Sequence, residues 1–151
     1  NYEDKCMAHS FLLESGLWNV KGNWFKPNLA PIPIEGVIQT AWKRENWFKI
    51  TTQLTCNDEK ATKIAYQCRG NLNYEEKYYT YVSQHSLLGN IEGEGRLGFQ
   101  SIIQYYWFIG TTSQEKGIDT FYRADSNTYH LTSSILKGHS VKHTIEAILS
   151  R

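Results

Sequence analysis

Polar and apolar residues alternate with a period of two along most of this sequence, and turn residues interrupt the alternation roughly every 8 to 14 residues. Such alternation indicates β-strands that bury one face. Ten strands are predicted from residue 17 onward, and they cover residues 18–24, 32–42, 47–55, 62–72, 75–86, 88–97, 99–109, 117–123, 128–136 and 140–149.

Strands that follow one another through short turns form a meander, and a meander leaves two unpaired edges unless it closes. Helical spacing occurs only in residues 3–14, where Met7, Phe11 and Leu12 precede a Ser-Gly stop signal. The sequence therefore predicts an all-β fold: an up-and-down antiparallel β-barrel of about 8–10 strands with one short N-terminal helix. Repeats and linkers are lacking, so the 151 residues are expected to form a single domain.

Three of the predicted strands indicate which residues share a face. One face is expected to carry Trp18, Val20, Gly22 and Trp24; Phe48, Ile50, Thr52 and Leu54; and Val141, His143, Ile145, Ala147 and Leu149. Gly93 and Gly95 also share a face, and this glycine-rich stretch leads into a strand rather than a helix. It therefore indicates a bend in the barrel wall or room for a ligand, and not a phosphate loop.

Composition excludes several partners. Sixteen Lys and Arg stand against 15 Asp and Glu, so a net charge of +1 gives no general attraction to nucleic acid. No run of 18 apolar residues predicts a membrane span, and the 151 residues do not have the pattern expected of a secretory leader. Cys6, Cys56 and Cys68 are expected to be free thiols, with a Cys56–Cys68 pair as the alternative, and free thiols favour a cytoplasmic location. A homodimer is compatible with the sequence.

No catalytic residue, metal site or cofactor motif emerges. His139 and His143 are four residues apart in a strand, where that separation spans about 13 Å. Glu92 and Glu94 share one face of a polar strand and are expected to face solvent. His143 is the polar residue on an apolar face, and it is either a core histidine or an anchor for a ligand or a haem.

The segment from Ser15 to Trp18, Ser-Gly-Leu-Trp, is similar to the Gly-x-Trp opening of lipocalins and their calycin relatives. Roughly the last 35 residues resemble a lipocalin-like family of uncharacterised bacterial proteins, through Asp-Thr-Phe-Tyr-Arg, Asp-Ser-Asn, Tyr-His-Leu and Lys-Gly-His segments and the closing strand. The resemblance implies one lipocalin-like barrel over residues 1–151. It also implies that Trp18 closes the barrel under a late arginine, either Arg123 or Arg151.

A barrel of this size can enclose one small apolar ligand. The first hypothesis is thus a binding protein for a hydrophobic or aromatic molecule, with lumen residues Gln53, Tyr79, Tyr106, Arg123 and His143. A slip of one residue in register would exchange each of them for a neighbour. The alternatives are an interaction module with a filled barrel, or an enzyme such as an isomerase, a cyclase or a pigment-handling lyase.

Overall fold

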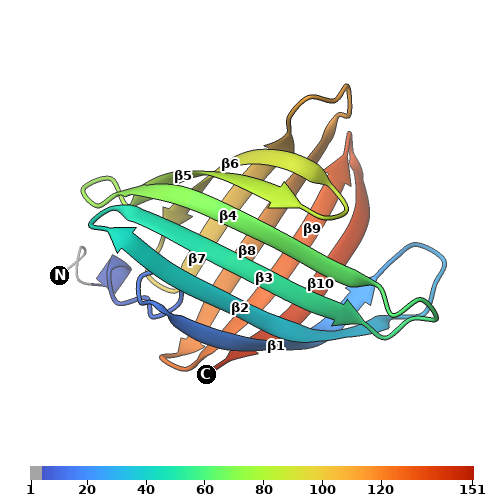
Figure 1. The fold of residues 1–151 in the computed structure, drawn as a ribbon, viewed down its shortest axis with the longest axis horizontal. Coiled ribbons are helices and arrows are strands. Elements are labelled where there is room, and N and C mark those ends of the chain that lie inside the picture. Colours follow the sequence, from blue (N-terminus) through green and yellow to red (C-terminus); the bar gives the residue numbers. More distant parts are fainter. Residues whose placement is uncertain (1–4) are drawn as a thin grey trace.

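Ten antiparallel strands close into one barrel in the computed structural model, which describes residues 5–151 (Figure 1). Each strand pairs with its neighbours in sequence, and β1 pairs with β10 to close the sheet. The prediction of an all-β, up-and-down barrel is confirmed. The strands are β1 Gly16–Phe25, β2 Ile32–Arg44, β3 Trp47–Cys56, β4 Lys63–Asn73, β5 Tyr78–His85, β6 Gly89–Leu97, β7 Ser101–Phe108, β8 Glu115–Asp125, β9 Thr128–Lys137 and β10 Ser140–Ser150.

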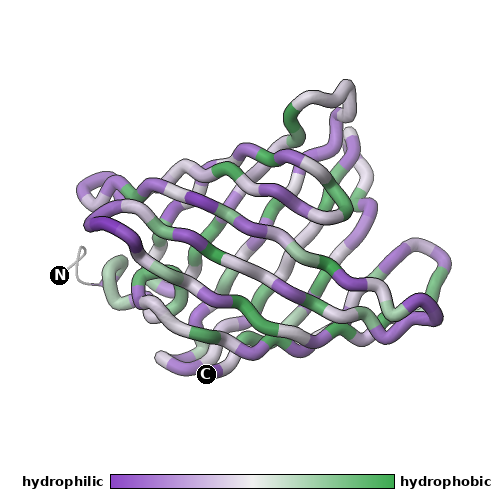
Figure 2. The backbone as a smooth tube through the Cα atoms, in the orientation of Figure 1, coloured by the Kyte–Doolittle hydropathy of each residue, from purple (hydrophilic) through white to green (hydrophobic). Residues whose placement is uncertain are grey.

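Alternation of hydropathy along the strands separates the barrel interior from its outer surface (Figure 2). In β3 the predicted face is buried throughout, from Phe48 to Leu54. In β10 the predicted face is wrong at Val141, whose side chain is 60% exposed. The pairing of β10 with β9 shifts between Val141 and His143, and a bulge of this kind reverses the facing of the residues before it.

The predicted N-terminal helix is wrong over the part of the chain that the structure describes. Lys5 and Cys6 have helical backbone, but residues 7–14 form turns and bends, and Leu12 has a positive φ of 76°. Phe11 and Leu12 are nevertheless buried. An isolated helix of this length is marginal in water, and packing of these side chains against the barrel decides the backbone instead. Residues 3 and 4 of the predicted helix lie outside the described residues.

The N-terminal segment closes one end of the barrel. The Phe11 ring stacks on Phe121, with 4.7 Å between ring centroids, and meets Trp18 edge-on at 5.8 Å. Trp18 also meets Tyr129 edge-on at 5.5 Å. We call Phe11, Trp18, Phe121 and Tyr129 the aromatic plug. The guanidinium of Arg151 lies 5.0 Å from the centre of the Trp18 ring, so Arg151 is the arginine that covers this tryptophan.

His9 ties the N-terminal segment to this closed end. Its Nε2 lies 2.8 Å from the carbonyl oxygen of Gly98, which can only accept, so Nε2 carries the proton. The neutral ring then accepts a hydrogen bond at Nδ1 from the Tyr129 hydroxyl, at 2.6 Å. Burial lowers the pKa of His9, which keeps this arrangement neutral.

The three cysteines are free and buried, as predicted, and the alternative Cys56–Cys68 pair does not form. Register explains this, because Cys56 of β3 pairs with Ile34 whereas Cys68 of β4 pairs with Ile50. Among the described residues, no helix is both long and apolar enough to cross a bilayer.

Candidate ligand-binding site

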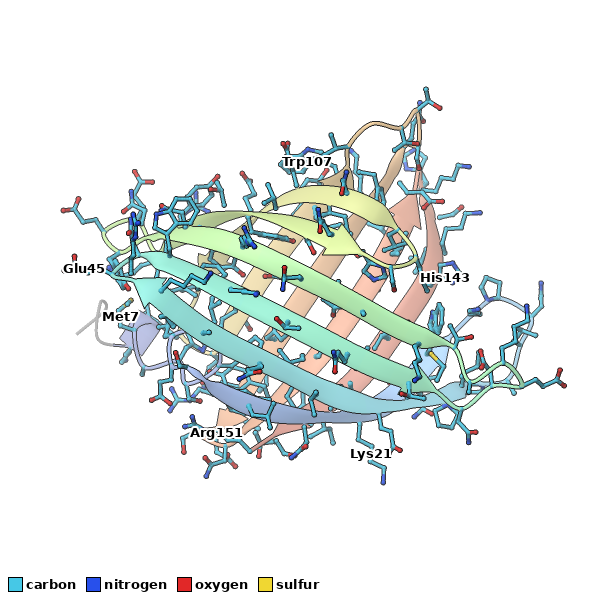
Figure 3. All side chains as sticks on the ribbon, in the orientation of Figure 1. Met7, Lys21, Glu45, Trp107, His143 and Arg151 are labelled. Atoms are coloured by element: carbon cyan, nitrogen blue, oxygen red, sulfur yellow. The ribbon has the colours of Figure 1, made fainter. Side chains whose placement is uncertain are left out.

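A cavity of about 330 Å³ occupies the barrel interior beyond the aromatic plug. It extends from Phe11 toward Lys26 and Leu87, which belong to the opposite end of the barrel, here called the mouth. Figure 3 shows His143 at the mouth and Met7 at the closed end. Most of the lining is apolar, and its aliphatic part is Val20, Ile34, Ile38, Ile50, Leu54, Ile64, Leu87, Leu88, Ile91, Leu131, Ile135 and Ile145.

Inward aromatic rings cover glycines of the neighbouring strand and so shape the cavity wall. Tyr106 of β7 pairs directly with Gly117 of β8, and a methyl group built on Gly117 would lie 1.8 Å from the Tyr106 ring. Tyr79 covers Gly95 in the same way, with a corresponding distance of 2.1 Å. The glycines therefore make room for tyrosine rings, which explains the glycine-rich stretch in the sequence.

Gly117→Ala is expected to lower the free energy of unfolding by about 1–3 kcal/mol, because the new methyl group overlaps the Tyr106 ring and overpacks the wall. Urea unfolding followed by circular dichroism measures the change. Gly16→Ala is the matched control, since no atom lies within 4 Å of its added methyl group, and it is expected to stay within about 1 kcal/mol of the wild type. Equal midpoints for the two variants would contradict the role given to Gly117.

A row of polar side chains crosses the cavity wall between β5 and β9. The Tyr79 hydroxyl reaches over Gly95 and donates to Gln104 Oε1 at 2.6 Å. Gln104 Nε2 donates to Asp119 Oδ2 at 2.9 Å, and Ser133 Oγ donates to Asp119 Oδ1 at 2.6 Å. Direct cross-strand pairing of Gln104, Asp119 and Ser133 produces the row.

Asp119 dominates the electrostatics of the lumen. Burial raises the pKa of its carboxyl group, and the hydrogen bonds from Ser133 and Gln104 offset part of that rise. Burial also raises the pKa of Tyr66, Tyr81 and Tyr106, and the nearby charge of Asp119 raises each of them further. These hydroxyls are therefore neutral at physiological pH and are able to donate a hydrogen bond.

Two polar atoms of the cavity lining are buried without a hydrogen-bond partner: the Tyr81 hydroxyl and Nδ1 of His143. Burial lowers the pKa of His143, and the charge of Lys26 lowers it further. An unsatisfied buried polar group costs about 1–3 kcal/mol. A ligand that offers a partner to either atom recovers this free energy.

The mouth is shaped by His85 and Lys26. His85 Nδ1 accepts hydrogen bonds from the backbone N–H groups of Leu87 and Leu88, at 3.1 and 3.2 Å. Its ring stacks on Tyr66 with 4.9 Å between ring centroids. Lys26 Nζ lies 4.1 Å from the centre of the Trp24 ring. The turn between β5 and β6, which lies at the mouth, thus depends on an unprotonated Nδ1 of His85.

The predicted site residues lie in different places. Tyr106 and His143 line the cavity, and Tyr79 belongs to the polar row. Arg123 is half-buried toward the closed end, where it pairs with Tyr129, and it does not line the cavity. The expectation that Gln53 faces the lumen is wrong, because its side chain is exposed between the buried Thr52 and Leu54.

Sequence reasoning missed the centre of the site, which consists of Asp119, Gln104 and Ser133. One signal was available for Asp119: it shares a strand face with Gly117 and Phe121, both of which are buried.

Other ionisable side chains of the described chain do not form a second site. Within residues 5–151, no group of three or more His, Cys, Asp or Glu side chains is placed so that it could hold a metal ion. Glu92 and Glu94 lie exposed on the outer surface, where they accept hydrogen bonds from Trp107 and Tyr78.

Comparison with known proteins extends to the fold. No family model matches this chain, and no curated protein matches its sequence. The solved structure of EF1p2_mFAP2b bound to DFHBI is similar, with a TM-score of 0.53 and 11% sequence identity. The match covers 96% of this chain and 98% of that one. The likeness is one of fold.

Proposed function

We propose that this barrel binds one small molecule with an apolar or aromatic body inside its lumen, in the manner of lipocalin-like proteins. The observation that carries the proposal is the cavity of about 330 Å³, which is closed at one end and lined mostly by apolar side chains. Pockets of this size and lining are typical of small-molecule sites. The fold likeness to EF1p2_mFAP2b bound to DFHBI supports the same interpretation.

Apolar burial would supply most of the affinity, at about 25 cal/mol per Å². The unpartnered Tyr81 hydroxyl and His143 Nδ1 would orient polar groups of the ligand. Tyr106 belongs to the proposed site as part of the wall. Gln53 and Arg123 are left out of it, because neither lines the cavity.

The two alternative functions fare differently. The cavity in the barrel interior does not support an interaction module with a filled barrel. An enzyme needs an ionisable side chain in the lumen with a shifted pKa, and Asp119 meets that requirement. An enzyme is therefore the second candidate. Native mass spectrometry would favour it if the wild type and a variant without the Asp119 carboxylate retained molecules of different mass.

The binding proposal predicts that the neutral probe N-phenyl-1-naphthylamine becomes fluorescent on the purified protein, and that Ser83→Phe weakens its binding at least about tenfold, or 1.4 kcal/mol. Ser83 is buried and lines the cavity, so a phenyl ring there occupies ligand space. Thr80→Phe adds the same ring to the exposed side of the same strand and is expected to bind the probe like the wild type.

Fluorescence titration measures the affinities, and circular dichroism checks that both variants fold. Native mass spectrometry of the purified wild type would in addition detect a molecule retained from the host. Equal probe affinity in the Ser83→Phe and Thr80→Phe variants would show that the probe binds outside the barrel, and it would contradict the proposal.

A further inference from the structure

Among the described residues, Asp119 is the only one with a carboxyl group in the cavity lining, and its hydrogen-bond partners there are neutral. Gln104 and Ser133 each donate one hydrogen bond, so each carboxylate oxygen keeps acceptor capacity. Within residues 5–151 no lysine or arginine forms an ion pair with Asp119. Lys26 is the lysine in the described cavity lining, and its ammonium group lies at the mouth over the Trp24 ring. A carboxylate taken out of water without a countercharge is costly.

Three tyrosines share the cavity with this carboxylate. Tyr66, Tyr81 and Tyr106 line the same cavity, and all three lie near enough to Asp119 for its charge to shift their titration. The faces of aromatic rings attract cations, and aromatic cages are a recurring way to bind quaternary and alkylated ammonium groups. The lumen thus combines a half-buried carboxyl group with aromatic side chains and an apolar remainder.

We propose that the ligand carries an organic cation, such as a protonated or alkylated amine, whose charged nitrogen lies against Asp119 while its apolar body fills the lumen. The inference rests on the proposed function and adds the chemical class of the ligand to it. The cation provides the countercharge that residues 5–151 do not place beside Asp119.

Such binding depends on pH, because the carboxylate must be ionised to attract the cation. The other groups that face Asp119 are Tyr66, Cys68, Tyr79, Tyr81 and Tyr106, and burial raises the pKa of each, so they remain neutral between about pH 5 and 8. At the mouth, burial lowers the pKa of His143 and lowers that of His85 to about 4, so His85 stays largely neutral above pH 5. Affinity for a cation is therefore expected to fall from pH 8 to pH 5.

The test displaces N-phenyl-1-naphthylamine with three matched competitors: 4-phenylbutylamine, 4-phenylbutanol and 4-phenylbutyrate. On the wild type at pH 8, the amine is expected to displace the probe at a concentration at least about tenfold below that of the alcohol, and the butyrate least well. In Asp119→Asn, which keeps the shape of the side chain and removes its charge, amine and alcohol are expected to agree within about threefold.

Glu35→Gln is the matched control, since it removes the same charge from the exposed side of β2, and it is expected to keep the full preference for the amine. If the Asp119 variant fails to fold, the wild-type series alone decides. Displacement by the alcohol or butyrate at or below the amine concentration overturns the cation inference and leaves the binding function standing. A preference for the amine that persists in Asp119→Asn also overturns it, whereas failure of the probe to bind at all removes the proposed function itself.

Discussion

Trp18→Ala is expected to lower the free energy of unfolding by about 3–5 kcal/mol, the range for removing a large aromatic side chain from a core. Trp18 is fully buried at the start of β1 and contacts both Phe11 and Tyr129 edge-on. Its loss removes the surface on which the N-terminal segment packs. The substitution should therefore destabilise the packing of both Phe11 in the N-terminal segment and Tyr129 in β9.

Urea unfolding measures this loss, and two further variants define its cause. Trp107→Ala removes the same side chain from the outer surface, where Trp107 is 36% exposed, and is expected to cost less than about 1 kcal/mol. Trp18→Phe keeps a buried ring and discards an indole N–H that has no hydrogen-bond partner, so it should cost less than half as much as the alanine variant. Equal losses for Trp18→Ala and Trp107→Ala would show that the aromatic plug does not stabilise the barrel.

The barrel could be predicted from the sequence because alternation is a local property. In β3, the residues from Phe48 to Leu54 alternate strictly, and the structure buries the predicted face. Val141 shows the limit of this reasoning. A bulge between β9 and β10 turns its side chain outward, and nothing in the local pattern marks the extra residue.

The N-terminal segment could not be predicted in the same way. Met7 and Phe11 have helical spacing, but spacing reports only which side chains could share a face. In the structure, Phe11 packs on Trp18 and also on Phe121 and Tyr129, and the last two lie more than 100 residues away along the chain. Long-range packing therefore overrides the local signal and leaves turns in place of a helix.

The polar row shows why the centre of the site was missed. Gln104 and Asp119 are 15 residues apart, and Asp119 and Ser133 are 14 apart, so only the exact strand register brings them together. An error of one residue would move the Asp119 carboxylate to the outer surface. Tyr106 and His143 were found because each stands out within its own strand, whereas Asp119 acquires its meaning from its neighbours across the sheet.

Acidification from pH 7 to about pH 4 is expected to destabilise the barrel through histidines that are neutral in the fold. Burial lowers the pKa of His9, His85 and His143, and the pKa of His85 falls to about 4. Between that value and 6.5, the unfolded chain binds more protons than the folded one, so the stability present above pH 6.5 is lost as the pH falls. Asp119 acts in the opposite direction, because its raised pKa lets the folded protein keep a proton that the unfolded chain releases.

His85 should account for up to about 3 kcal/mol of this loss, as the shift from 6.5 to about 4 implies. Its neutral Nδ1 accepts the two backbone hydrogen bonds that hold the turn at Leu87 and Leu88, and protonation there removes both. The His85→Asn substitution supplies a side-chain oxygen that can accept hydrogen bonds from the same turn, and this amide does not titrate.

The His85→Asn variant is therefore expected to lose less free energy of unfolding than the wild type between pH 7 and pH 4.5, as measured by urea unfolding at both pH values. An NMR titration of the His85 ring should give a pKa near 4. A ring that titrates near 6.5, or a variant that is as sensitive to acid as the wild type, would show that the turn at the mouth does not depend on a neutral His85. Because that turn borders the cavity, the same protonation is expected to loosen the mouth before the aromatic plug at the other end gives way.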